Sequence, residues 1–166
     1  MTHILLWNVT SVDQILPRLF IGNSSSAKDL SFLSSSGISR ILSCGSEFKS
    51  GSTFPDIERV VLDIQDNEWL EGRTEAEFDR GVQQLRTWMD GGETVLVHCK
   101  AGVSRSVTTV LLYLMGMGWT LSDAFAVVHS GRPRAYPYAM YWRLLLMRDE
   151  EAKRARYTCV SCKTKE

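Results

Sequence analysis

The hydrophobic positions of this chain fall into short runs and into helical repeats that alternate along its length. Short apolar runs bounded by polar turns predict β-strands at residues 14–16, 19–21, 38–43, 59–64 and 94–98. Apolar residues at helical spacing predict helices at residues 27–36, 74–90, 106–116, 120–130 and 138–156. This alternation predicts an α/β fold, with a mostly parallel central sheet of about five strands flanked by helices on both faces.

Local signals set the limits of two central elements. Thr74 and Glu77 have the spacing of a capping box, so we expect a helix to begin there. The pair Gly91-Gly92 ends this helix. The run from Thr94 to His98 is apolar until its last residue, which is typical of a buried parallel strand at the centre of a sheet.

The size and charge of the chain restrict its class. Its 166 residues suit one domain, which we expect at residues 1–156, followed by a short polar tail at residues 157–166. Basic and acidic residues number 19 each, so no overall basic field favours a nucleic acid partner. The longest apolar stretch, Val110–Trp119, is about half of a membrane span, so we expect no membrane partner. Without a targeting signal we expect a cytoplasmic protein, with the nucleus as the alternative; the oligomeric state is left open.

Four cysteines raise the question of metal or redox chemistry. In a reducing compartment we expect free thiols. Cys159 and Cys162 form a lone CxxC pair in the tail, whereas structural zinc usually takes four protein ligands. We therefore expect no metal site and no cofactor, with zinc bridging between chains as the alternative. Cys44 is expected to be a buried thiol, and a disulfide with Cys99 under oxidation is its alternative.

The segment around Cys99 carries the chemistry. The predicted central strand delivers Cys99 to the carboxyl edge of the sheet, where open α/β sheets bind their ligands. The loop that follows contains Gly102 and leads into a helix near Arg105, so we place an anion-binding loop between the last central strand and this helix. Backbone amides and the helix N-terminus should lower the thiol pKa below the ~8.5 of free cysteine. The planar guanidinium of Arg105 can hold two phosphate oxygens.

These residues resemble a known family. His98-Cys99, Gly102 and Arg105-Ser106 match the His-Cys-x5-Arg-Ser/Thr signature of the cysteine-based protein tyrosine phosphatase superfamily. The form of the loop is most similar to that of the dual-specificity phosphatases, particularly their small, stand-alone, atypical members. The resemblance extends over residues 12–150.

The resemblance implies a role for each residue of the loop. Cys99 would be the nucleophile and Arg105 the phosphate clamp, while the hydroxyl of Ser106 would stabilise the departing thiolate. His98 would support the loop from behind. The phosphate would be bound by Lys100, Ala101, Gly102, Val103, Ser104 and Arg105.

The family also implies a general acid in a loop before the long helix. Asp66 best fits the register of an apolar strand followed by an acidic loop. Such a carboxylate can protonate the leaving oxygen and then activate water. Asp63 is the nearest alternative, although it falls within the predicted strand, and Glu68 fits less well.

The implied activity is hydrolysis of phosphotyrosine, and of phosphoserine and phosphothreonine, on protein substrates. Two alternatives stay open: a pseudophosphatase that binds phosphorylated sites without turnover, and a phosphatase of a non-protein phosphate such as a phosphoinositide. The inositol-lipid relatives carry extra loop lysines, whereas this chain has Lys100 but Val103. Arg132 and Arg134 would flank the pocket, either as substrate contacts or as a solvated edge.

Overall fold

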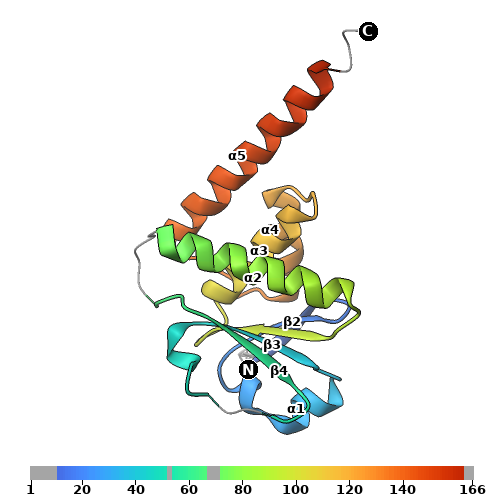
Figure 1. The fold of residues 1–166 in the computed structure, drawn as a ribbon, viewed down its shortest axis with the longest axis vertical. Helices are drawn as coiled ribbons and strands as arrows, with labels where there is room; N and C mark the ends of the chain where they lie inside the picture. Colours follow the sequence, from blue (N-terminus) through green and yellow to red (C-terminus); the bar gives the residue numbers. More distant parts are fainter. Residues whose placement is uncertain (1–10, 52–53, 67–71, 163–166) are drawn as a thin grey trace, which may run out of the picture.

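A five-stranded sheet forms the centre of the fold (Figure 1). The computed structural model describes residues 11–51, 54–66 and 72–162, with side chains up to residue 156. The strand order is β1-β2-β5-β3-β4, in which β1 and β2 pair antiparallel and the other neighbours pair parallel. The strands are β1 Val12–Leu16, β2 Leu19–Gly22, β3 Arg40–Cys44, β4 Glu58–Leu62 and β5 Val95–His98. The predicted α/β fold with a mostly parallel sheet is confirmed.

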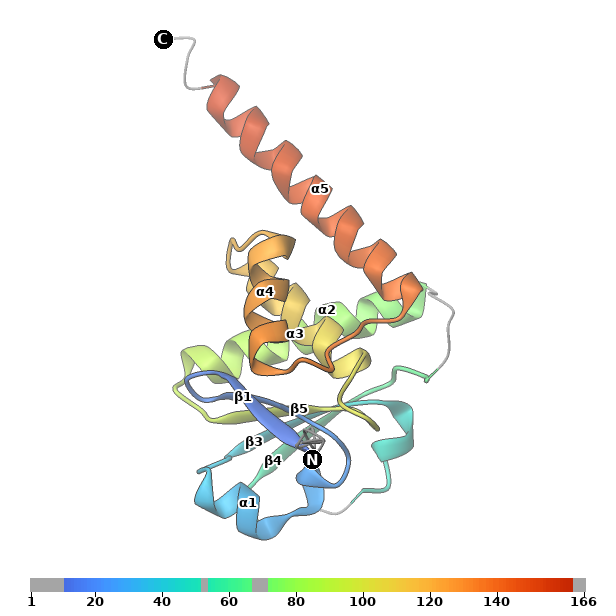
Figure 2. The ribbon, with the colours of Figure 1, turned by 180° about the vertical axis from the view of Figure 1, so that it is seen from behind.

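Helices cover both faces of the sheet (Figures 1 and 2). One face carries the short α1 Leu30–Ser35, and the 3-10 turns η1 Ser26–Lys28 and η2 Ser46–Phe48 lie near the same end of the molecule. The other face carries α2 Gly72–Asp90, α3 Arg105–Gly116, α4 Leu121–Gly131 and α5 Ala139–Cys162.

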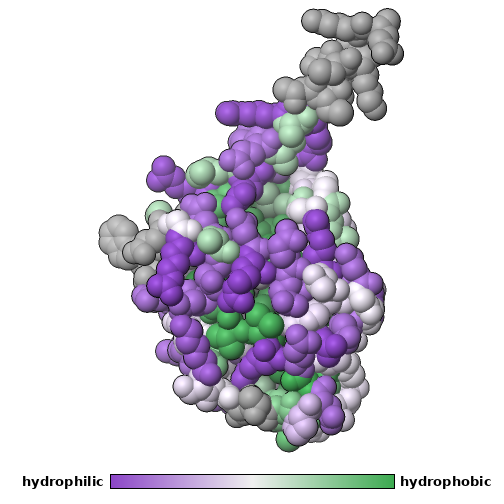
Figure 3. Space-filling view, viewed as in Figure 1, coloured by the Kyte–Doolittle hydropathy of each residue, from purple (hydrophilic) through white to green (hydrophobic). Residues whose placement is uncertain are grey.

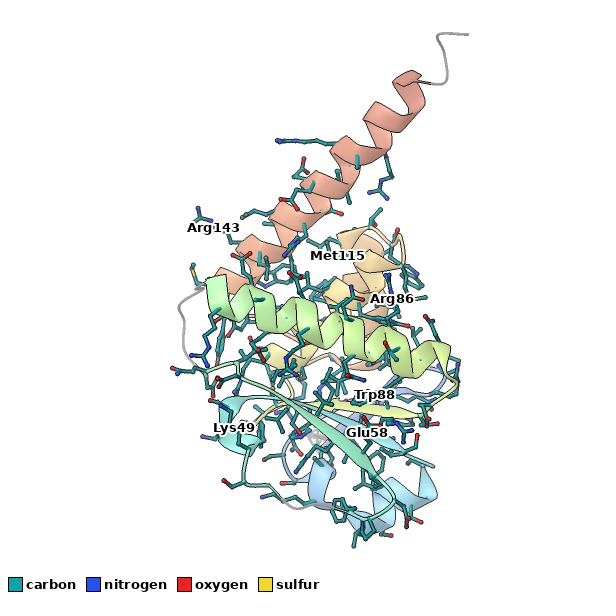
Figure 4. All side chains as sticks on the ribbon, in the orientation of Figure 1. Lys49, Glu58, Arg86, Trp88, Met115 and Arg143 are labelled. Atoms are coloured by element: carbon teal, nitrogen blue, oxygen red, sulfur yellow. The ribbon has the colours of Figure 1, made fainter. Side chains whose placement is uncertain are left out.

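The central strand β5 is buried on both sides. Val95 and Val97 point into the large core shared with α2 to α5, and Leu96 points into the smaller core under α1. Trp88 of α2 is 4% exposed and packs into the large core beneath the helix (Figure 4). Because β5 is enclosed on both faces, the loop that leaves its carboxyl end starts from a rigid support.

The start of α2 differs from the prediction. The helix begins at Gly72, so Thr74 lies inside its first turn and the predicted capping box is wrong. The Glu77 carboxylate instead accepts the backbone N–H of Asp63 at 2.6 Å and pairs with Arg80. The carboxylate thus ties α2 to the chain leaving β4, a long-range contact that local spacing did not reveal.

The last helix is longer than predicted and extends away from the rest of the molecule (Figures 1 and 2). It continues to Cys162, so most of the segment predicted as a polar tail is helical. The side chains of Cys159 and Cys162 lie outside the described residues. In the space-filling view the face carrying α2 is largely hydrophilic (Figure 3). Within the described ranges, no helix combines the length and the hydropathy that crossing a membrane requires.

Candidate active site

The loop from Cys99 to Ser104 joins β5 to the N-terminus of α3, as predicted. Gly102 has a φ of +65°, which side-chain-bearing residues rarely adopt. A Cβ atom there would lie 2.4 Å from the carbonyl oxygen of Gly22. The loop therefore passes against the end of β2, and only glycine allows this approach.

The thiol of Cys99 lies inside this loop and is 3% exposed. Its Sγ accepts the backbone N–H of Gly102 at 3.2 Å and the hydroxyl of Ser106 at 3.4 Å. Burial alone would raise the thiol pKa, but hydrogen bonds from Ser106 and the positive charge of Arg105 outweigh it and lower the pKa. The thiolate fraction near neutral pH is therefore larger than for a free cysteine.

Arg105 is held by two carboxylates from other segments. Its side chain is 1% exposed, and Nη1 lies 2.8 Å from Glu47 while Nη2 lies 3.2 Å from Asp66. These acids and the thiolate raise the pKa of Arg105 despite its burial. Glu47 was missed by the sequence analysis because it lies in a polar segment with no periodicity. The two carboxylates therefore hold the guanidinium beside the loop through its two terminal nitrogens.

The structure separates the two acid candidates. Asp66 faces the site, where it contacts Arg105 and accepts a hydrogen bond from the Tyr138 hydroxyl at 3.3 Å. Asp63 is engaged elsewhere, with Lys49 at 3.0 Å and with Arg73. The hydrogen bond from Lys49 and the charges of both cations lower the pKa of Asp63. This position supports Asp66 over Asp63, and Glu68 lies outside the described residues.

His98 supports the loop from inside the sheet. Its ring is fully buried, with Nε2 2.7 Å from the Ser43 hydroxyl and Nδ1 3.4 Å from the carbonyl oxygen of Cys99. Burial, and then the charges of nearby cations, lower the His98 pKa to about 3, so the ring is neutral at physiological pH. If Nδ1 donates to Cys99, Nε2 accepts from Ser43, so one tautomer satisfies both contacts.

The two serines that flank Arg105 make different contacts. The Ser104 hydroxyl does not cap α3; it accepts the backbone N–H of Tyr138 at 2.9 Å. Ser106 directs its hydroxyl to Cys99. The first serine therefore fastens the loop that ends at Tyr138, and only the second touches the reacting sulfur.

Arg132 is a structural support of the loop. It is fully buried, donates from Nε to the Gly102 carbonyl at 2.6 Å and pairs with Asp13. Its guanidinium is thus engaged by the loop backbone and by Asp13, which favours a supporting role over a solvated edge. Arg134 is partly exposed.

Cys44 is a buried thiol with a hydrogen-bond contact to Thr109 at 3.4 Å. Burial raises its pKa to about 12. It therefore stays protonated, whereas the pKa of Cys99 is lowered, and neither of these two cysteines forms a disulfide. This matches the expectation of a packing residue.

A thiolate held by amide and hydroxyl donors beside a fixed guanidinium is suited to attack a phosphate ester. The family model "Dual specificity phosphatase, catalytic domain" matches residues 19–151 of the chain. The chain belongs to the dual-specificity phosphatase family. It is therefore a member of the cysteine-based phosphatase superfamily whose signature its loop carries.

Relatives of this family match over most of the chain. Human dual specificity protein phosphatase 22 is 36% identical over 138 residues, covering 81% of this chain and 71% of the relative. The human DUSP28 structure superposes with a TM-score of 0.76 at 25% identity, covering 87% of this chain and 96% of that one. A mouse phosphatase of this family, solved with zinc tungstate, gives 0.78 at 25% identity, covering 88% and 91%. A protein phosphatase activity follows from this membership.

Proposed function

We propose that this phosphatase hydrolyses phosphotyrosine, and phosphoserine and phosphothreonine, on proteins through a phosphocysteine on Cys99, without a metal ion. The observation that carries the proposal is the position of the Cys99 sulfur, which meets the Gly102 amide, the Ser106 hydroxyl and the field of Arg105. These donors stabilise the thiolate, and Arg105 can clamp the phosphoryl oxygens.

In the first step the Cys99 sulfur attacks phosphorus and the bond from phosphorus to the side-chain oxygen breaks. Asp66, in its protonated form, gives a proton to the leaving oxygen. The products are the dephosphorylated side chain and a phosphocysteine. The contact between Asp66 and Arg105 supports this role because it holds the carboxyl group next to the phosphate clamp.

In the second step water attacks the phosphocysteine, and Asp66 accepts a proton from that water. The bond between sulfur and phosphorus breaks, inorganic phosphate leaves and Cys99 returns as a thiolate. The hydroxyl of Ser106, 3.4 Å from Sγ, supports this step because it can donate to the sulfur as its negative charge reappears.

The proposal is tested by hydrolysis of p-nitrophenyl phosphate with and without a strong chelator. We expect turnover that the chelator leaves unchanged and that vanadate blocks. Turnover lost on chelation and restored by a divalent cation would exclude a mechanism that uses cysteine alone. Binding of phosphopeptides without turnover by the unaltered protein would favour the pseudophosphatase alternative.

We expect Asp66→Asn to lower kcat by about 10²- to 10⁴-fold for alkyl phosphates, the range for loss of a general acid. The loss should be smaller for p-nitrophenyl phosphate, because nitrophenolate leaves with little need of a proton. Asp63→Asn is the matched control and should change kcat by less than about threefold, since Asp63 pairs with Lys49 and Arg73. The opposite ranking of the two variants would assign the acid to Asp63.

A further inference from the structure

Tyr138 connects the catalytic loop with the carboxyl group of Asp66. Its backbone N–H donates to the Ser104 hydroxyl of the loop at 2.9 Å, and its own hydroxyl donates to Asp66 at 3.3 Å. Burial, and then the charge of Asp66, raise the pKa of Tyr138. The phenol therefore stays protonated at neutral pH and keeps the proton that this hydrogen bond requires.

The ring of Tyr138 is anchored by the core of the protein. It stacks on the ring of Tyr141, with centroids 5.8 Å apart and an angle of 25° between the planes. Tyr141 is fully buried and meets the ring of Phe78 edge-on at 5.1 Å. A side chain that is already held in this way loses little further rotamer freedom when it binds a neighbour. Tyr138 is therefore suited to fix the position of Asp66.

Asp66 uses a different oxygen for each of these contacts. Its Oδ1 accepts from the Tyr138 hydroxyl, and its Oδ2 lies 3.2 Å from Nη2 of Arg105. In the proposed function Arg105 clamps the phosphoryl oxygens, so the arriving phosphate replaces Oδ2 at the guanidinium. The phenol is uncharged, and phosphate competes for it less strongly. Binding of substrate therefore frees Oδ2 and leaves Oδ1 with its partner.

We propose that Tyr138 is a positioning residue for the general acid, because its hydroxyl holds Oδ1 of Asp66 while Oδ2 faces the leaving oxygen. The inference rests on the proposed function and deepens it by giving each oxygen its own task. In the first step Oδ2 gives its proton to the leaving oxygen as the bond from phosphorus to that oxygen breaks. In the second step Oδ2 accepts a proton from the attacking water, and Tyr138 keeps its own proton throughout.

The length of the contact is consistent with this role. Its 3.3 Å exceeds the roughly 2.8 Å usual between two hydroxyl-type oxygens. Catalytic hydrogen bonds are often long without substrate and shorten in the substrate complex. Here the pull of Arg105 on Oδ2 opposes the approach of Oδ1 to the phenol, and the phosphate removes that pull. The contact therefore contributes most when substrate is bound.

The test is Tyr138→Phe, which removes the hydroxyl and keeps the stacked ring. We expect kcat/KM to fall about tenfold on phenyl phosphate, the effect of one lost hydrogen bond to a charged group. On p-nitrophenyl phosphate the loss should be less than about twofold, because nitrophenolate leaves with little need of a proton. Binding of vanadate should stay within about twofold of the wild type, since the contacts of Cys99 and Arg105 are untouched.

Tyr136→Phe is the matched control from the same loop between α4 and α5. Tyr136 reaches the catalytic loop through its backbone N–H, which donates to the Val103 carbonyl at 2.9 Å, and it is 69% exposed. Its kcat/KM on both substrates should stay within about twofold of the wild type. An equal loss on the two substrates in Tyr138→Phe, or the same selective loss in Tyr136→Phe, would overturn the assignment.

A double-mutant cycle with Asp66→Asn separates failure of this inference from failure of the proposed function. Asparagine has no proton to give, so Tyr138→Phe should change kcat/KM on phenyl phosphate by less than about twofold in that background. A full tenfold loss there would show that Tyr138 acts without Asp66. A large loss in Asp66→Asn with none in Tyr138→Phe would overturn this inference alone, whereas an Asp66→Asn variant as active as the wild type would contradict the proposed function.

Discussion

Replacing Cys99 by serine is expected to lower kcat by at least about 10⁴-fold, the order of loss when a covalent nucleophile is removed. The physical reason is that the loop stabilises an anion at this position. Its amides, the Ser106 hydroxyl and Arg105 lower the pKa of a thiol. The pKa of a serine hydroxyl is far too high for the same field to ionise it. The measurement is single-turnover and steady-state hydrolysis of p-nitrophenyl phosphate.

The variant should still fold and bind oxyanions, because two contacts that shape the loop, from Arg132 to the Gly102 carbonyl and from Gly102 to the end of β2, do not involve the sulfur. Its melting temperature should rise on addition of tungstate, as for the wild type. Cys44→Ser is the matched control: its hydroxyl can keep the contact to Thr109, and turnover should stay within a few-fold of the wild type. Wild-type turnover in Cys99→Ser would rule out the phosphocysteine mechanism.

Replacing Arg105 by lysine is expected to lower kcat/KM by about 10²- to 10³-fold, comparable to removal of an oxyanion-stabilising donor. Lysine keeps the charge but has no planar fork, so it cannot hold two phosphoryl oxygens at once. It also cannot reach Glu47 and Asp66 with two separate nitrogens, as the guanidinium does at 2.8 and 3.2 Å. Both kcat and KM should therefore change, which initial-rate measurements will show.

Arg134→Lys is the control for a change of cation in the neighbouring loop, and we expect it to have little effect on either constant. Arg105→Lys should bind vanadate more weakly than the wild type does, since the Arg105 clamp acts on the oxygens of the bound oxyanion itself. Activity of Arg105→Lys within threefold of the wild type would mean that charge alone suffices and that the bidentate geometry has no catalytic role.

The order of strands and helices and the core of the site were predictable because each depends on residues close together in the chain. Burial of β5 follows from its unbroken apolar run, and the loop follows from a cysteine, a glycine and an arginine within seven positions. The same reasoning failed at Thr74 and Glu77, where the spacing of a cap was present but Glu77 instead binds the backbone of Asp63. A tertiary contact outweighed the local signal there.

The sequence by itself determined the fold class, the anion-binding loop and the residues within it, since their geometry arises from a strand end and a helix start a few residues apart. Only the tertiary structure decided that Glu47 holds Arg105, that Arg132 supports Gly102, and that Asp66 faces the site. These partners come from polar segments without periodicity. Their side chains are brought together by the packing of the sheet and helices. The energy of that packing is distributed over the whole core, so no single position in the sequence indicates it.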